Sequence, residues 1–177
     1  MTTISTDFRI DRDRVFATGH SNGMIMSYRL ICEAADVFVA AAGQAGTLGV
    51  DDRRPSDPVS LRHIHGSADT NLPIDGGRGT TGVSGVESPS PRVGIETLAA
   101  TDGSPRRSRT SVDGPASTRT WKPCDNRTTT QFVTVDGANH GWMGGPRTLR
   151  PGAPEPFADY DSSASVWKFL AAHPRLG

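Results

Sequence analysis

Hydrophobic residues along the chain occur in short runs with two different spacings. Some runs are rich in β-branched and aromatic residues and predict strands, at 14–18, 59–65 and 131–135. Others carry apolar residues at helical spacing, at 24–35, 92–100 and 161–172. Asp161 or Ser162 can cap the last of these helices, and Pro174 follows its end. The pattern therefore predicts a chain that mixes strands with helices.

The first predicted strand leads directly into a Gly-x-Ser-x-Gly sequence, Gly19–Gly23. A strand, a tight turn, a serine and a helix in this order are typical of a nucleophile elbow, whose strained turn exposes the serine hydroxyl. We expect Gly19 and Gly23 to let strand and helix approach closely, because neither has a Cβ. The backbone N–H of Asn22 would then face an oxyanion formed by attack of Ser21. The alternative is an ordinary Gly/Ser loop that caps a helix.

Two further chemically capable residues lie just beyond predicted strands. Asp69 follows the second strand, and His140 follows the third. Functional groups gather at the carboxyl ends of strands in open α/β sheets, so both are expected near Ser21. The order serine, aspartate, histidine is also that of α/β-hydrolase triads. Asp75 and Asp136 are rival acids, but Asp136 is too near His140 in sequence and Asp75 lies deeper in a loop, so Asp69 is preferred.

These motifs carry a resemblance to a known family. The chain is similar to the esterases that include polyhydroxybutyrate depolymerases and feruloyl or acetylxylan esterases, in RVFATGHSNGMIMSYRL, HIHGSADTNLPIDGG, TVDGANHGW and VWKFLAAHPR. The resemblance covers nearly the whole chain and is weakest over 78–118. It implies an α/β-hydrolase fold, with a mostly parallel sheet and flanking helices, and hydrolysis of carboxylic esters through an acyl-enzyme. Matched by position, Ser21 is the nucleophile, Asp69 the acid and His140 the general base.

The position of the elbow within the chain changes what the resemblance implies. Family members have several strands before the elbow and a loop, often with a His-Gly pair, that gives a second oxyanion donor. Here twenty residues precede Ser21. Residues 1–177 are therefore expected to form a single partial domain, with the elbow strand at an edge of the sheet and weak catalysis. The alternatives are an inactive fragment of such an esterase and a module that binds a polymer without cleaving it.

Other residues near these motifs have competing interpretations. His20 and Trp142 are candidate substrate-binding residues, with loop filling and packing over the active-site loop as the alternatives. His63 and His65 share one face of a strand, but no Asp, Glu or Cys is spaced to complete a metal site. We therefore expect neither a metal nor an organic cofactor.

Composition narrows the expected partners. The 177 residues have a formal net charge of zero, which gives no indication of nucleic-acid or membrane binding and suits an ester substrate, small or polymeric. Residues 1–14 lack the apolar core of a signal peptide, and the longest apolar run, 37–42, is too short to cross a bilayer. The resemblance implies an extracellular protein. The oligomeric state stays open.

Two parts of the chain have weak patterns. Residues 76–119 are rich in Gly, Ser, Thr and Pro, and we expect this segment to be loop-rich or disordered, with a lid over the site as the alternative. Family members often pair a cysteine at the position of Cys124 with one in an Asp-Gly-Cys segment, which here reads Asp102-Gly103-Ser104. Cys124 is then expected to be a free thiol, although a bridge to Cys32 stays open.

Overall fold

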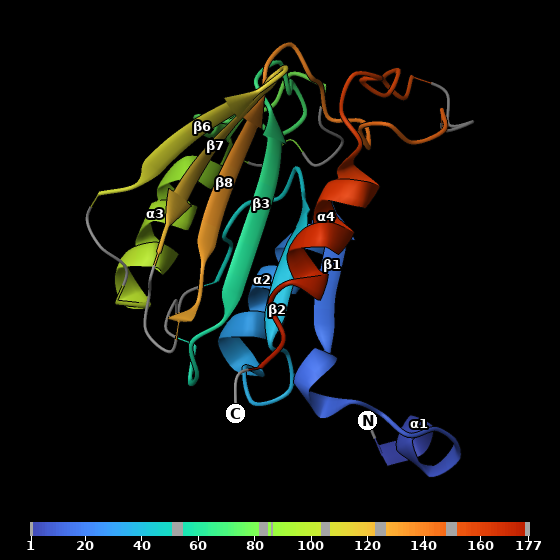
Figure 1. Cartoon of the computed structure of the whole chain (residues 1–177). Helices are drawn as coiled ribbons and strands as arrows, with labels where there is room; N and C mark the ends of the chain where they lie inside the picture. Colours follow the sequence, from blue (N-terminus) through green and yellow to red (C-terminus); the bar gives the residue numbers. More distant parts are fainter. Residues whose placement is uncertain are drawn as a thin grey trace.

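A six-stranded sheet with helices on both faces forms the centre of the protein (Figure 1). The computed structural model describes residues 2–50, 55–81, 85, 87–103, 107–122, 127–147 and 152–175. The strands of this sheet, in spatial order, are β1 (Phe16–His20), β2 (Ala40–Gln44), β3 (Ser60–Gly66), β8 (Thr130–Val135), β7 (Ala116–Trp121) and β6 (Arg109–Asp113). The first four run parallel, and β7 and β6 complete the sheet as an antiparallel pair. Separately, β4 (Gly77–Arg78) pairs with β5 (Glu87–Ser88).

The helices divide between the two faces of the sheet. α2 (Asn22–Glu33) and α3 (Pro91–Thr101) cover one face, and α4 (Ser162–Ala171) covers the other (Figure 1). Side-chain caps start two of them: Ser90 accepts from the N–H of Val93, and Asp161 accepts from the N–H of Ala164. The short helix α1 (Thr2–Asp7) lies away from the sheet in Figure 1, and the 3-10 turn η1 (Arg12–Arg14) leads into β1. None of the described helices has the length and apolar character needed to cross a membrane.

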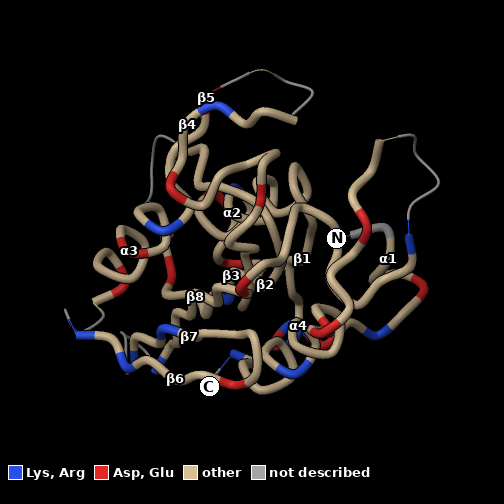
Figure 2. Tube along the Cα trace, turned by 90° about the horizontal axis from the view of Figure 1, so that it is seen from above, with Lys and Arg blue, Asp and Glu red and all other residues tan. Residues whose placement is uncertain are grey.

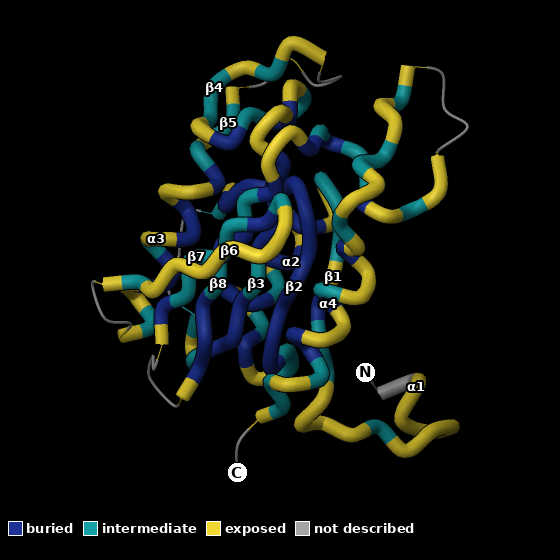
Figure 3. The backbone as a smooth tube through the Cα atoms, turned by 45° about the horizontal axis from the view of Figure 1, so that its top comes forward, coloured by how far each residue is buried: buried dark blue, intermediate teal, exposed yellow. Residues whose placement is uncertain are grey.

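The alternation of side chains along the strands produces two apolar layers. Ala41 of β2 and Phe132 of β8 face α2 and α3. Their neighbours Ala42 and Val133 face α4 and pack with Phe169 of that helix. Figure 3 shows the resulting buried centre along β2, β3 and β8, whereas α1 and β6 are exposed. Charged residues of both signs are distributed around the outside of the chain (Figure 2).

This architecture confirms the predicted α/β class, with its mostly parallel sheet and flanking helices. The strand before Ser21 is confirmed as an edge strand of the described sheet, because β1 pairs with β2 and is the terminal strand. The other part of that prediction, that residues 1–177 form a single partial domain, stays a prediction.

The prediction of a loop-rich or disordered segment at 76–119 needs correction within its described residues. Besides helix α3, which matches the helix predicted at 92–100, that segment contains the short β4–β5 pair and the β6–β7 hairpin. The hairpin strands carry many Arg, Ser and Thr residues, and every residue of β6 is exposed, so no apolar alternation marks them in the sequence. β7 pairs with β8, a long-range contact that composition does not report, and β6 pairs with β7 across the hairpin.

The second elbow glycine also departs from the prediction. A Cβ on Gly19 would meet the backbone carbon of Gly23 at 2.2 Å, whereas a Cβ on Gly23 would meet nothing within 4 Å. A Cβ on Gly43 of β2 would meet the Gly19 carbonyl oxygen at 2.3 Å and the Met24 sulfur at 2.5 Å. The close approach therefore requires Gly19 and Gly43, while Gly23 has room for a methyl group.

We expect Gly43→Ala to lower the free energy of unfolding by about 3 kcal/mol, because its methyl group would overlap backbone that cannot move aside cheaply. Gly23→Ala is the matched control, and its effect should stay within about 1 kcal/mol, since alanine favours the helix. Urea unfolding of both variants checks this. Equal losses for the two variants would contradict it.

Candidate active site

The turn after β1 holds Ser21 in a backbone conformation that few residues other than glycine adopt. Its φ is 55° and its ψ is −118°. The Ser21 N–H donates to the Gln44 carbonyl oxygen at 3.0 Å, and the Ser21 carbonyl accepts from Met24 and Ile25 of α2. Strain of this kind persists only where neighbours fix it, and these bonds to β2 and α2 do so. Asn22 is the first residue of α2, where helix geometry leaves the N–H without a partner inside the helix.

The loop after β3 presents Asp69. One carboxylate oxygen, Oδ1, accepts from the backbone N–H groups of Asn71 and Leu72, both at 2.9 Å. The other oxygen, Oδ2, lies 2.8 Å from Nδ1 of His140. Asp69 is buried, with 4% of its surface exposed. Its carboxylate is therefore held at both oxygens and is aimed at the histidine.

The loop after β8 completes the arrangement. His140 Nε2 lies 2.9 Å from Ser21 Oγ, on the opposite side of the ring from Asp69. The structure thus brings together all three residues that the sequence predicts for the triad, from the ends of β1, β3 and β8. The rival acids lie elsewhere: Asp75 forms an exposed ion pair with Arg92, and Asp136 accepts from Ser67.

Electrostatics favour an ionised Asp69. Burial alone would raise its pKa, but the hydrogen bond and charge of His140, the Leu72 N–H and the nearby His65 together outweigh burial and hold the pKa below its ordinary value. An ionised Asp69 accepts the Nδ1 proton of His140. The Nε2 lone pair of His140 then faces Ser21, which is the orientation that a general base needs.

The two candidate substrate-binding residues support the histidine loop. His20 Nε2 bonds to the His140 carbonyl oxygen at 2.6 Å, and burial is the main cause of its lowered pKa. The Trp142 indole N–H donates to Ser163 of α4 at 3.0 Å, and its ring meets His20 edge-on. These contacts favour packing over the active-site loop for Trp142, and a substrate contact for either residue stays a prediction.

Gln44, at the end of β2, was missed by the sequence reasoning. Its side chain is fully buried, and its Nε2 donates to the Gly141 carbonyl at 2.7 Å. Its Oε1 accepts from the Met143 N–H and from the Ser162 hydroxyl. Gln44 therefore fastens the histidine loop to the sheet and to α4. A glutamine at the end of a buried strand indicates a polar group that holds a neighbouring loop. Here that interpretation requires β2 to be recognised as a strand first.

His63 and His65 bond to each other, with His63 Nε2 at 2.9 Å from His65 Nδ1. Both side chains are buried on β3, and Tyr28 of α2 bonds to His63. Burial is the main cause of the lowered pKa of each histidine. Within the described residues, no group of three or more His, Cys, Asp or Glu side chains is arranged to hold a metal ion. Cys32 is buried on α2, and Cys124 lies outside the described residues, so the state of the two cysteines stays a prediction.

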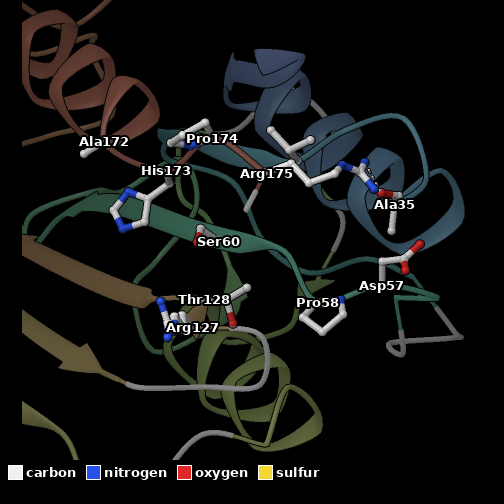
Figure 4. A pocket seen from close by; sticks show the side chains of 11 residues that line it. Ala35, Asp57, Pro58, Ser60, Arg127, Thr128, Ala172, His173, Pro174 and Arg175 are labelled. Carbon is white, nitrogen blue, oxygen red and sulfur yellow. Dashed lines mark hydrogen bonds between the residues drawn. The ribbon is translucent and has the colours of Figure 1, made fainter. Parts of the chain in front are cut away.

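Figure 4 shows the residues that line a cavity of about 380 Å³. Ser60, Thr128 and His173 are among the residues that line it. Ser60 begins β3 and Thr128 precedes β8, so the cavity is at the amino ends of the strands, whereas Ser21, Asp69 and His140 lie beyond the carboxyl ends. The guanidinium of Arg175, also in its wall, donates to the carbonyls of Ala35 and Asp36. The cavity is therefore separate from the serine site.

The mostly parallel sheet with its flanking helices is an α/β-hydrolase-like fold, and the hydrogen-bonded serine, histidine and aspartate lie beyond the carboxyl ends of its strands. Among curated proteins, the chain is 31% identical over 159 residues to NocK of Nocardia uniformis subsp. tsuyamanensis, which is named as an esterase, covering 81% of this chain and 46% of NocK. It is 39% identical over 77 residues to feruloyl esterase C of Emericella nidulans, covering 44% of this chain and 28% of that protein. The chain therefore spans less than half of either relative.

A solved structure gives the same fold. The acetyl xylan esterase from Aspergillus awamori superposes with a TM-score of 0.54 at 15% identity, over 78% of this chain and 58% of the other. No protein-family model matches the sequence. The chain is thus similar to proteins named esterase and feruloyl esterase, which confirms that part of the predicted resemblance. The relatives do not single out polyhydroxybutyrate depolymerases.

The buried histidines predict how stability depends on pH. Because burial lowers the pKa of His63 and His65, both stay neutral in the folded protein, while unfolded histidines take up protons below about pH 6.5. The contribution of these two histidines to the free energy of unfolding is complete above that pH. It is lost as the pH falls below it, at up to about 1.4 kcal/mol per pH unit for each histidine. Asp69, with its lowered pKa, adds a loss only below about pH 4.

Urea unfolding at pH values from about 5 to 8 measures this slope. His63→Gln should flatten the slope by about one histidine's share, because glutamine does not titrate. A slope between pH 5 and 6.5 that is the same with and without His63 would contradict the prediction.

Proposed function

We propose that this chain carries the catalytic triad of a carboxylic-ester hydrolase, with Ser21 as nucleophile, His140 as general base and Asp69 as the orienting acid. The observation that carries the proposal is the continuous line of hydrogen bonds from Asp69 through His140 to Ser21, at 2.8 and 2.9 Å. The esterase names of the relatives support the same reaction class.

The geometry suits a two-step reaction through an acyl-enzyme. In the first step His140 Nε2 accepts the Ser21 proton while Oγ bonds to the ester carbonyl carbon, and the carbonyl electrons become an oxyanion. The N–H of Asn22 donates to that oxyanion. When the intermediate collapses, the ester C–O bond breaks and His140 gives its proton to the departing alcohol. Water then repeats the sequence on the acyl group and releases the acid.

Asp69 acts through the histidine. Its Oδ2 accepts the Nδ1 proton of His140, which fixes the tautomer and stabilises the imidazolium that forms in each step. The two backbone N–H groups on Oδ1 keep the carboxylate in place while the charge on the ring changes.

The substrate class that we propose is an ester of an aromatic or acetyl group on a polysaccharide. The support is the printed names of the relatives, feruloyl esterase and acetyl xylan esterase. Hydroxyalkanoate polyesters and small acyl esters are the alternatives. A polymeric substrate would also suit the extracellular location that the resemblance implies.

A fluorophosphonate probe tests the nucleophile directly, because it reacts with a serine only when a base activates it. We expect covalent labelling of the protein at Ser21, located by peptide mass spectrometry. Ser21→Ala and His140→Ala should both abolish labelling. Ser67→Ala, which removes a serine hydroxyl from a nearby loop but not from the triad, should leave it unchanged. Labelling at another serine, or labelling that persists in His140→Ala, would overturn the assignment.

Asp69→Asn should lower kcat on a p-nitrophenyl ester by about 10⁴-fold, because an asparagine N–H facing His140 favours the wrong tautomer of the ring. Asp136→Asn is the matched control, since this carboxylate accepts from Ser67 and does not contact His140. Steady-state kinetics of both variants measure the effect. A comparable loss in the two variants would show that the acid is assigned wrongly.

A further inference from the structure

A line of three fully buried polar side chains runs beneath the loop that presents Asp69. Tyr28 Oη lies 2.5 Å from His63 Nδ1, and His63 Nε2 lies 2.9 Å from His65 Nδ1. His65 Nε2 lies 2.8 Å from the Leu72 carbonyl oxygen and 3.4 Å from Asp69 Oδ2. None of the three side chains is exposed to solvent. We call Tyr28, His63 and His65 the buried relay.

The carbonyl of Leu72 fixes the direction of every proton in the buried relay. A carbonyl oxygen can only accept, so His65 must donate from Nε2, which leaves its Nδ1 as an acceptor. His63 must then donate from its own Nε2, and its Nδ1 accepts. Tyr28 is left as the donor at the far end, consistent with burial that raises its pKa and keeps the hydroxyl protonated. Burial lowers the pKa of both histidines, so each ring is neutral and carries its single proton at Nε2.

The packing around the rings fixes their orientation. The His63 ring is nearly parallel to the rings of Phe132 of β8 and of His65, at ring-centroid distances of 5.4 and 5.2 Å, and it is also nearly parallel to the Tyr28 ring. The charged or titratable groups that face the relay are Cys32, beside Tyr28, and Asp69 and His140, beside His65. The relay is therefore uncharged, and its hydrogen bonds all donate toward the Asp69 loop. Its last residue, His65, lies beside the ionised Asp69.

The two ends of the relay lie on the elements that carry the two halves of the proposed site. Tyr28 lies on α2, the helix that begins directly after Ser21. His65 holds the carbonyl of Leu72, and the N–H of the same Leu72 donates to Asp69 Oδ1. The proton on His65 Nε2 also faces Asp69 Oδ2, the oxygen that bonds to His140. A shift of His65 would therefore disturb both oxygens of the carboxylate.

We propose that Tyr28, His63 and His65 are positioning residues that hold the Asp69 loop in place opposite His140. In this support, each hydrogen bond donates toward the Asp69 loop. The proposal rests on the proposed function, because the relay acts through Asp69. It also explains why polar side chains occupy this part of an otherwise apolar layer, where each buried group costs free energy unless it is hydrogen-bonded.

Ring-nitrogen NMR of histidine-labelled protein tests the relay without reference to activity. We expect two histidines, assigned to His63 and His65 by single His→Gln variants, to show the neutral Nε2–H form from about pH 5.5 to 8. A proton at Nδ1 of either ring, or titration of either ring with an ordinary midpoint of about 6.5, would overturn the proposal.

Tyr28→Phe tests the link to the site, because it removes the hydroxyl that donates to His63 Nδ1 and keeps the aromatic ring. We expect kcat on a p-nitrophenyl ester to fall about 10-fold with KM unchanged, and the midpoint of the acid limb of the pH–rate profile to move. Tyr160→Phe is the matched control, since its hydroxyl bonds to Ser165 and Arg62 on the opposite face of the sheet, and it should change neither quantity. Equal effects of the two variants would overturn the proposal.

His65→Gln and His65→Leu separate positioning from bulk structure. Glutamine can still donate to the Leu72 carbonyl, so it should keep fluorophosphonate labelling within about 10-fold of the unmutated rate, whereas leucine should lose at least another 10-fold. Equal labelling of the two variants would overturn the relay. If the unmutated chain is not labelled at Ser21, the esterase proposal fails by itself, and the NMR result still decides the proton direction of the relay.

Discussion

The site depends on the close approach of three pieces of backbone around Gly19 and Gly43. β1 and β2 pair through these two glycines, and the first turn of α2 lies against both, at distances that leave no room for a Cβ. That approach holds Ser21 in its strained conformation, because the N–H of Ser21 bonds to β2 while its carbonyl starts α2. A larger residue at either glycine would separate the elements, and the serine hydroxyl would no longer face His140.

The rest of the site is supported by polar groups that are buried and fully hydrogen-bonded. Gln44 fastens the histidine loop, and the Tyr28–His63–His65 line fastens the aspartate loop. Among the described residues, no buried side-chain nitrogen or oxygen is left without a hydrogen-bond partner. Such networks are rigid when they are complete and costly when one member is lost. These hydrogen bonds therefore specify the position of each loop as well as stabilise it, because each bond forms in only one arrangement of the loop.

The sequence allowed prediction of the residues that react but not of most residues that hold them. Ser21, Asp69 and His140 each follow a strand with β-branched or aromatic residues, and their spacing resembles a known family. β2 was missed because its first four residues, three Ala and a Gly, are small and have weak strand preference, which suits a position packed between helices on both faces. β6 and β7 were missed because their many Arg, Ser and Thr residues give them the composition of a loop. The contacts that join β2 and β7 to the rest of the sheet are long-range.

The missed strand β2 is the element that sets the distances within the site. It lies between β1, which leads to the serine, and β3, which leads to the aspartate. β1 and β3 are therefore two strand spacings apart. Its last residue accepts from the N–H of Ser21 through its backbone and donates to the carbonyl of Gly141 through its side chain. One residue, Gln44, thus contacts both the serine turn and the histidine loop. Because small residues along β2 also let α2 and α4 pack closely, the same feature that hides this strand in the sequence allows it to bring the three side chains within hydrogen-bonding distance.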